Sequence, residues 1–487
     1  MRGGIYRRMD SPFGLGGPAR PTQFPGFRLR LAMVGKVALS LLLLGSVLAP
    51  AEETNRPAFR LGIDVLADGG FRELKGKRVG LVTNPSGVDG KGVPSWKRFR
   101  ESPEVNLVAL YGPEHGVFGK VGAGKHVSGE RHGEDKNNDG KISKDEESGI
   151  KVFSLYGDTR KPTPRMLEGI DVMVYDLQDV GCRSYTYIST LGLVMEAAAE
   201  KGIEVMVLDR PNPLGARRVE GPRPQGPDVI PSFIGQFDVP YVYGLTVGEI
   251  SKWINDKHLR HPCRLMVIPM KGWAQDMVWE DTGLKWVPTS PNIARIEAAR
   301  GYVATGFFGE LGVSNGANPA GVPTKGLDGT TAYPFDLIAL EGVDAERFCR
   351  EMAEWGFNGV NFTPFRFKPP TGKYRHITMS GAKVAIDPKA PANLTAINIA
   401  GLAYLRRMMP KKNFFADAEN TLMFDKLNRS RDTRKQVLAG MGSRQIVASW
   451  EPGVQRWLEE RKPYLLYPET LAPVRKVPTV QPARLKP

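Results

Sequence analysis

Acidic side chains lie directly after short apolar runs of this sequence. Glu114 stands in the run Gly-Pro-Glu-His-Gly, and Asp176 and Asp179 stand in the run Asp-Leu-Gln-Asp-Val-Gly-Cys-Arg-Ser-Tyr-Thr-Tyr. Hydrolysis of a glycosidic bond requires one carboxyl group that protonates the departing oxygen, and a second group that activates water or attacks the sugar carbon. These requirements make Glu114 a candidate general acid, and Asp176 or Asp179 a candidate second carboxylate, of a glycoside hydrolase.

The polar runs also supply groups that suit a sugar ligand, because aromatic rings cover sugar faces while amides and charged groups bind hydroxyls. The candidate substrate-binding residues in these runs are His115, Gln178, Arg183, Tyr185, Tyr187, Asp209, Arg210 and Asn212. Each has a structural alternative. A glutamate in a turn can cap a helix, Asp209 and Arg210 can form an ion pair, and the two tyrosines can pack in a core. The prediction therefore depends on these residues gathering at one place.

Alternating strands and helices must position these residues. Short apolar runs predict strands at 78–83, 107–111, 152–156, 171–177, 204–209 and 264–269. Helical composition or spacing lies between them at 95–101, 165–168, 187–201 and 247–256. This order predicts a Rossmann-like α/β domain over residues 58–328, with a parallel sheet covered on both faces. The carboxyl ends of parallel strands meet at one edge, so we expect the polar runs to share one cleft there.

The regular alternation of predicted strands and helices ends at about residue 329. Helical stretches at 345–355, 394–409, 433–441 and 453–460 enclose short strand-like runs such as 383–387. Residues 329–467 are therefore expected to form a smaller mixed α/β domain. Residues 468–487 are basic and rich in proline, which is typical of a disordered tail.

A second constellation has the spacing of a calcium-binding loop. The twelve residues from 135 to 146 fit the pattern D-x-[DN]-x-[DN]-G-x5-E, which supplies the oxygen ligands that Ca²⁺ prefers. The candidate ligands are Asp135, Asn137, Asp139, Lys141 through its carbonyl, Ser143 and Glu146. No convincing helix precedes the loop, so we expect a structural Ca²⁺ ion in an insertion at 120–149. The alternative is a polar surface loop.

The ends of the chain carry most of its basic charge. The net charge of the 487 residues is +15, and basic residues dominate at 1–51 and 472–487, so the central part offers no strong field for nucleic acid. The apolar run 37–49, preceded by basic residues and followed by Ala-Pro-Ala, predicts a signal peptide at 1–51, with Met33 as a possible true start. We expect a periplasmic or secreted protein with no stable membrane span after cleavage.

Two further sequence patterns argue against particular kinds of metal, redox and nucleotide site. Three cysteines without CxxC spacing argue against zinc and redox motifs and favour buried free thiols, although one disulfide is possible in an oxidising compartment. Residues 119–125 match GxxxxGK, but His126 stands where a nucleotide-binding loop needs Ser or Thr. We therefore expect no nucleotide and no other organic cofactor.

At these motifs the sequence resembles a bacterial family of exo-β-N-acetylmuramidases, formerly a family of unknown function, whose members release terminal N-acetylmuramic acid from peptidoglycan fragments. The resemblance runs in order through nearly the whole mature chain. It rests on GLVTNPSGVD (80–89), LYGPEHGVFG (110–119), FSLYG (153–157), VYDLQDVGCRSYTYISTL (174–191), VLDRPNPLG (207–215), VEGP (219–222), GLTVGEI (244–250), DTGLKWVPTSPNI (281–293) and RKPYLLY (461–467). It implies a Rossmann-like domain with a smaller C-terminal domain, makes Glu114 the leading catalytic residue, and adds Asn84, Ser290 and Asn292 to the substrate-binding candidates. The implied partners are peptidoglycan-derived sugars or muropeptides.

Two departures from the family pattern affect the expected specificity. Tyr243 stands where the family pattern has histidine in Arg-His-Gly, and the run GELGVSNGAN (309–318) lacks the arginine of the family's usual sequence. Arginine is a natural partner for the lactyl carboxylate of muramic acid. The alternatives are therefore a hydrolase of another glycan, or a non-catalytic glycan-binding protein that uses the same cleft.

Overall fold

The computed structural model describes residues 58–119, 121, 125, 143–144, 150–318, 321–369 and 375–471. The candidate calcium ligands Asp135, Asn137, Asp139, Lys141 and Glu146 lie outside these residues, as do the signal-peptide region and the tail from 472. Ser143 begins a two-residue strand, β3 (Ser143–Lys144). Among the described residues, no helix is long and apolar enough to cross a membrane.

Six parallel strands form the main sheet, which confirms the predicted α/β class. The strands are β1 (Arg78–Thr83), β2 (Asn106–Gly112), β4 (Lys151–Ser154), β5 (Val172–Asp176), β6 (Glu204–Leu208) and β7 (Arg264–Ile268), each within two residues of its predicted bounds. The order is β3-β4-β2-β1-β5-β6-β7, with β3 antiparallel at one edge. Strand order reverses between β1 and β5, and in sheets of this kind ligands bind beyond the carboxyl ends of the strands at such a point.

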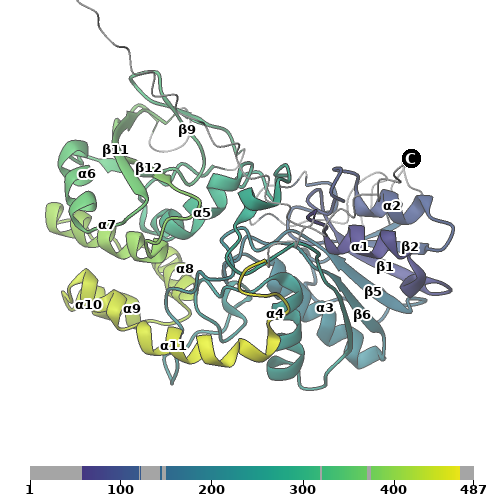
Figure 1. Ribbon diagram of the computed structural model, residues 1–487. Helices are drawn as coiled ribbons and strands as arrows, with labels where there is room; N and C mark the ends of the chain where they lie inside the picture. The colour runs from purple at the N-terminus through teal and green to yellow at the C-terminus, as the bar shows by residue number, and fades with distance from the viewer. Residues whose placement is uncertain are drawn as a thin grey trace, which may run out of the picture. The chain divides into compact units, whose positions relative to one another are not determined.

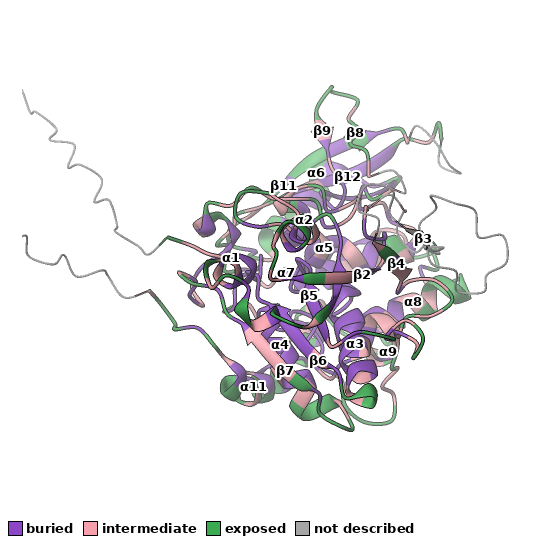
Figure 2. Cartoon of the chain, turned by 90° about the vertical axis from the view of Figure 1, so that its right-hand side faces the viewer, coloured by how far each residue is buried: buried purple, intermediate pink, exposed green. Residues whose placement is uncertain are grey.

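The strand sequences suit their places in this sheet. Every residue of β5 is buried, whereas β7 at the far edge is mostly half-exposed, as Figure 2 shows by colour. A strand buried on both faces needs a continuous run of β-branched and other apolar residues, which β5 has in Val-Met-Val-Tyr. The continuous apolar runs therefore fixed the positions of the central strands.

Helices cover both faces of the sheet (Figure 1). α1 (Gly62–Asp68) and α2 (Ser95–Glu101) lie on one face, and α3 (Tyr187–Lys201) and α4 (Val247–Trp253) lie on the other. The helix expected at 165–168 is wrong. These residues form turns between Pro164 and Gly169, and so short a segment cannot recover the free energy of helix nucleation.

The C-terminal part combines a small antiparallel sheet with helices. β10 (Leu337–Glu341), β12 (Met379–Ile386) and β11 (Val360–Phe367) pair in that order. α6 (Ala345–Glu354) packs against β11 and β12, and α7 (Leu394–Met408) packs against α6. A hairpin joins β8 (Thr324–Lys325) to β9 (Thr331–Ala332). The remaining helices are α8 (Ala418–Asn428), α9 (Asp432–Leu438), α10 (Ser443–Ala448) and α11 (Glu451–Glu460), of which α8 and α10 were not predicted.

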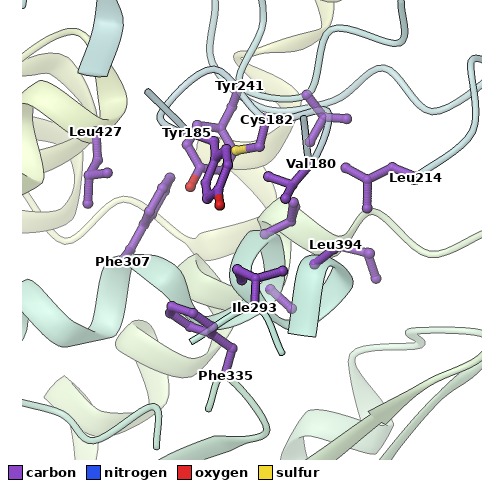
Figure 3. Close-up of a cluster of buried hydrophobic side chains, with 14 of the residues drawn as sticks. Val180, Cys182, Tyr185, Leu214, Tyr241, Ile293, Phe307, Phe335, Leu394 and Leu427 are labelled. Carbon is purple, nitrogen blue, oxygen red and sulfur yellow. The ribbon is translucent and has the colours of Figure 1, made fainter. Parts of the chain in front are cut away.

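The two parts of the chain share a hydrophobic core. In α5 (Ile296–Thr305) the carbonyl of Val303 accepts a hydrogen bond from Asn398 of α7, so α5 is tied to the C-terminal elements. Figure 3 shows part of this core, in which Tyr185, Tyr241 and Phe307 gather near Cys182. All three cysteines are buried and free, which agrees with the reading of Cys182, Cys263 and Cys349 as buried thiols.

Candidate active site

Glu114 is held in a tight turn that follows β2. A Cβ atom on Gly112 would lie 2.7 Å from the backbone nitrogen of Val117, so only glycine lets the chain turn here. His115 has a left-handed φ of 73°, and its Nδ1 lies 2.7 Å from the carbonyl oxygen of Val121. A non-glycine residue in this conformation is uncommon and often marks a functional site. The buried imidazole of His115 thus holds the turn, while the Glu114 side chain stays half-buried beside it.

Two other strand ends provide the neighbours of the Glu114 carboxylate. Thr186, at the start of α3, donates a hydrogen bond of 2.6 Å from Oγ1 to Oε2 of Glu114. Tyr156 follows β4, and its pKa is raised to about 12, first by burial and further by the Glu114 carboxylate. The same carboxylate raises the pKa of Tyr185, Tyr187 and Tyr302, although burial has the larger effect. Glu114 therefore lies among tyrosines at the carboxyl ends of β2, β4 and β5.

Tyr185 and Tyr187 form a supporting layer behind this carboxylate. Their rings meet edge to face with centroids 4.7 Å apart. The Tyr187 hydroxyl donates to the carbonyl of Thr289 at 2.5 Å and accepts from Nδ2 of Asn84 at 2.6 Å, while the Tyr185 hydroxyl donates to Oγ1 of Thr289 at 2.8 Å. The Asn84 Oδ1 accepts from Ser86. Asn84 and the tyrosine hydroxyls therefore join β1, β5 and the segment before α5.

Ser290 and Asn292 continue this layer and are half-buried. Oγ of Ser290 accepts from the backbone of Ile293 at 3.3 Å, and Oδ1 of Asn292 accepts from the backbone of Asn318 at 3.2 Å. Their side chains thus stabilise the loop before α5 and also remain partly exposed near Tyr185. Their substrate-binding role stays a prediction.

Asp176 is engaged in a buried ion pair. Its Oδ1 accepts from Nε of Arg210 at 2.6 Å and its Oδ2 from Nη2 at 2.9 Å, and both side chains are almost fully buried. Arg210 also donates to the carbonyl of Val88. This two-pronged contact occupies both carboxylate oxygens, which favours a structural role for Asp176 and Arg210 over proton transfer.

Asp179 keeps one carboxylate oxygen unpaired among the described residues. Its Oδ1 accepts from the Tyr243 hydroxyl and from the backbone of Gly181, each at 2.7 Å, whereas its buried Oδ2 has no hydrogen-bond partner there. Burial raises the pKa of Asp179 to about 7. Oε1 of the neighbouring Gln178 is likewise buried and unpaired. Of the two predicted second carboxylates, Asp179 is therefore the one with an oxygen that no described residue binds.

Three other predicted binding residues have structural partners instead. The guanidinium of Arg183 donates to the carbonyls of Pro222, Val239 and Leu427 and is fully buried. The carboxylate of Asp209 accepts from the backbones of Arg210 and Gly248 and from the hydroxyls of Thr246 and Tyr467. Asn212 bonds the backbones of Leu214 and Leu245. These three side chains bind other groups of the protein. The structure therefore favours a role in stabilising the fold over a role in binding substrate.

The stability of the fold should fall as pH rises from about 4 to about 7. Burial raises the pKa of Asp209 to about 6 and the pKa values of Asp179 and Glu249 to about 7. A carboxyl group with a raised folded-state pKa stabilises the fold fully below its unfolded pKa of about 4, and that stabilisation is lost as pH rises through the folded value. Burial lowers the pKa of His258, so this one imidazole makes the stability of the fold rise with pH and opposes the effect of the carboxyls.

We therefore expect a higher melting temperature at pH 5 than at pH 8 in thermal scans of the intact protein. Replacing Glu249 with glutamine should flatten this dependence, because one of the buried carboxyls with a strongly raised pKa is then absent. A melting temperature that rises steadily from pH 5 to pH 8 would show that these carboxyls do not control stability.

Sequence reasoning missed Thr186, Tyr156 and Tyr302, which surround Glu114. Thr186 lies inside a run that had been singled out, and Tyr156 follows β4 just as Glu114 follows β2. The rule that places polar residues at strand ends would thus have found both. Tyr302 lies in α5, and only the tertiary structure brings it to Tyr185, with ring centroids 6.0 Å apart. No group of three or more potential metal-ligating side chains occurs within the described ranges.

Comparisons with known proteins match both parts of this chain to one family. The family models for exo-β-N-acetylmuramidase NamZ match residues 79–297 with the N-terminal domain and residues 300–467 with the C-terminal domain. The peptidoglycan β-N-acetylmuramidase NamZ of Bacillus subtilis (strain 168) is 33% identical over 434 residues, which is 88% of this chain and 97% of that protein.

Two crystal structures of DUF1343 family proteins from Bacteroides fragilis NCTC 9343 are similar in fold. One superposes with a TM-score of 0.73 at 39% identity, and the other with a TM-score of 0.59 at 23% identity. Each comparison covers 85% of this chain and 100% of the other chain. The second likeness shows the fold alone.

Proposed function

Because this chain belongs to the exo-β-N-acetylmuramidase NamZ family, we propose that it is an exo-acting glycoside hydrolase that releases terminal N-acetylmuramic acid or a related amino sugar from peptidoglycan fragments. The observation that carries the assignment of the site is the position of Glu114. Its half-buried carboxylate lies at the carboxyl edge of the sheet, hydrogen-bonded by Thr186 and surrounded by tyrosines. A carboxyl group so placed can reach a ligand and is also held in a defined orientation.

Glu114 is the group that protonates the departing glycosidic oxygen. Thr186 fixes one carboxylate oxygen and is a positioning residue, because it acts through Glu114. Tyr156 lies beside the same carboxylate and offers an aromatic face and a hydroxyl to a sugar. This combination of an acid with neighbouring rings supports a pyranoside substrate.

Asp179 is the stronger of the two candidates for the second catalytic group. Its Oδ2 has no partner among the described residues, whereas both oxygens of Asp176 bind Arg210. A carboxyl group with a pKa of about 7 can gain and lose a proton near neutral pH, as general acid–base catalysis requires. Asp179→Asn should lower kcat if the carboxyl takes part, and an unchanged kcat would remove it from the mechanism.

The proposed reaction can be tested with two substrate types. We expect the protein to release a chromophore from an aryl β-N-acetylmuramide, and free N-acetylmuramic acid from the non-reducing end of a disaccharide that it forms with N-acetylglucosamine. The exo mode predicts no cleavage inside longer glycan chains. Tight binding of these sugars without any hydrolysis would instead support a glycan-binding protein.

Export and calcium binding are proposals that rest on the sequence outside the described residues. Export to the periplasm or medium predicts a mature N-terminus near Ala51, which mass spectrometry of the recovered protein would reveal. A structural Ca²⁺ in the loop 135–146 predicts that EDTA lowers the melting temperature and that added Ca²⁺ restores it. A melting temperature indifferent to both treatments would contradict a structural ion.

A further inference from the structure

Arg160 presents an exposed guanidinium beside the candidate active site. It belongs to the segment that follows β4, four residues after Tyr156. Its central carbon lies 5.2 Å from the ring centroid of Tyr156 and 4.3 Å from that of Phe233, and these two rings are 6.0 Å apart. Such cation–π contacts hold the guanidinium by its faces and leave the N–H groups at its edge to bind a ligand.

The two rings that Arg160 contacts lie close to Glu114. The carbonyl of Phe233 accepts a bond of 2.6 Å from Oγ of Ser189, and Ser189 lies about one helical turn along α3 from Thr186. Thr186 in turn donates to Glu114. Tyr156 lies near both Arg160 and Glu114. The Arg160 guanidinium lies over its ring, and the pKa of its phenol is raised by the Glu114 carboxylate and lowered by Arg160. Arg160 and Glu114 therefore border the same site.

Two other arginines near this edge of the sheet already bind groups of the protein. Arg210 binds Asp176, and Arg183 is buried with both of its Nη atoms bound to backbone carbonyls. Lys161, next in sequence to Arg160, binds Glu196 and Glu200. Arg160 has no ion pair with any residue that the structure describes. Among the described arginines at this site, Arg160 is therefore the one that can accept an anionic group of a ligand.

We propose that Arg160 binds the carboxylate of an acidic amino sugar held beside Glu114. The inference rests on the proposed function and names the residue that selects the substrate class. N-acetylmuramic acid is N-acetylglucosamine with an added lactyl ether, and this lactyl group carries the one carboxylate that N-acetylglucosamine lacks. A bond from arginine to a carboxylate is charge-assisted and geometrically specific, which makes Arg160 a specificity-determining residue.

The test compares two sugars in wild type, Arg160→Gln and Arg160→Lys. Arg160→Gln should lower kcat/KM on an aryl β-N-acetylmuramide by about 10- to 100-fold, the usual range for a lost charged hydrogen bond. Activity on the aryl β-N-acetylglucosaminide should change less than about threefold, since that sugar lacks the carboxylate. Arg160→Lys should keep part of the preference, because charge remains while the planar fork is lost. Arg264→Gln, an exposed arginine on β7, is the matched control.

Binding of the free sugars separates this inference from the proposed reaction. Calorimetry with N-acetylmuramic acid and N-acetylglucosamine requires no turnover. Arg160→Gln should weaken binding of the acidic sugar alone by a similar factor, even if wild type hydrolyses neither aryl glycoside and the proposed function fails. An equal loss for both sugars, or no loss for either, would overturn the assignment of Arg160.

Discussion

Replacing Glu114 with glutamine is expected to lower kcat on a muramic-acid disaccharide by about 10²–10⁴-fold, the usual contribution of a general acid. Glutamine has the shape of glutamate and can keep the contact with Thr186, but it has no proton to give to a departing oxygen. Glu114 is only half-buried, so we expect its replacement to cost little stability.

The leaving group provides a sharper readout than activity alone. A nitrophenolate leaves without protonation, whereas a sugar alkoxide does not. The loss caused by Glu114→Gln should therefore be much larger for the disaccharide than for a nitrophenyl glycoside. Equal losses on both substrates would argue that Glu114 positions the sugar and does not donate the proton.

Thr186→Val serves as the matched control for this experiment. It removes one hydrogen bond to the Glu114 carboxylate but leaves the carboxyl in place, so kcat should fall by about tenfold, in line with one lost bond to a charged group. If Glu114→Gln retained wild-type kcat on the disaccharide, the acid would have to be another residue.

Replacing Arg210 with methionine is expected to lower the free energy of unfolding by about 3–5 kcal/mol. The Asp176 side chain is fully buried, and Arg210 is its ion-pair partner at 2.6 Å. Removal of the guanidinium would leave a carboxylate in the core with no compensating charge. Chemical denaturation followed by tryptophan fluorescence would measure the loss, and the melting temperature should fall in parallel.

Two variants distinguish this effect from a general loss of packing. Arg60→Met removes one partner of the exposed Arg60–Asp68 pair and should change stability by less than about 1 kcal/mol. The double variant Asp176→Leu with Arg210→Met removes both buried charges and should recover much of the lost stability. If Arg210→Met were as stable as wild type, the ion pair would not contribute to the stability of the fold.

The sequence by itself determined the sheet and the place of its functional edge. Buried parallel strands need continuous apolar runs, and such runs can be recognised in the sequence alone. The turn after β2 could be recognised in the same way, because Gly112 and Gly116 flank Glu114 and His115. Since parallel strands end at one edge, the sequence also indicated that the loops after β2 and β5 would meet. It did not show α8 and α10, which pack in the C-terminal part and have weaker local signals.

Only the tertiary structure decided what each polar residue does at that edge. Asp176 ends β5 and Asp179 lies three positions further on, yet Asp176 binds Arg210, which follows the next strand, while one oxygen of Asp179 has no partner among the described residues. Arg183 had the type of a ligand-binding residue, but its guanidinium is used by carbonyls as distant as Leu427. No sequence pattern singled out Arg160. Only the tertiary structure shows that its guanidinium contacts the rings of Tyr156 and Phe233. The physical reason is that a polar group's role depends on which partners reach it, and those partners come from elements far apart in the chain.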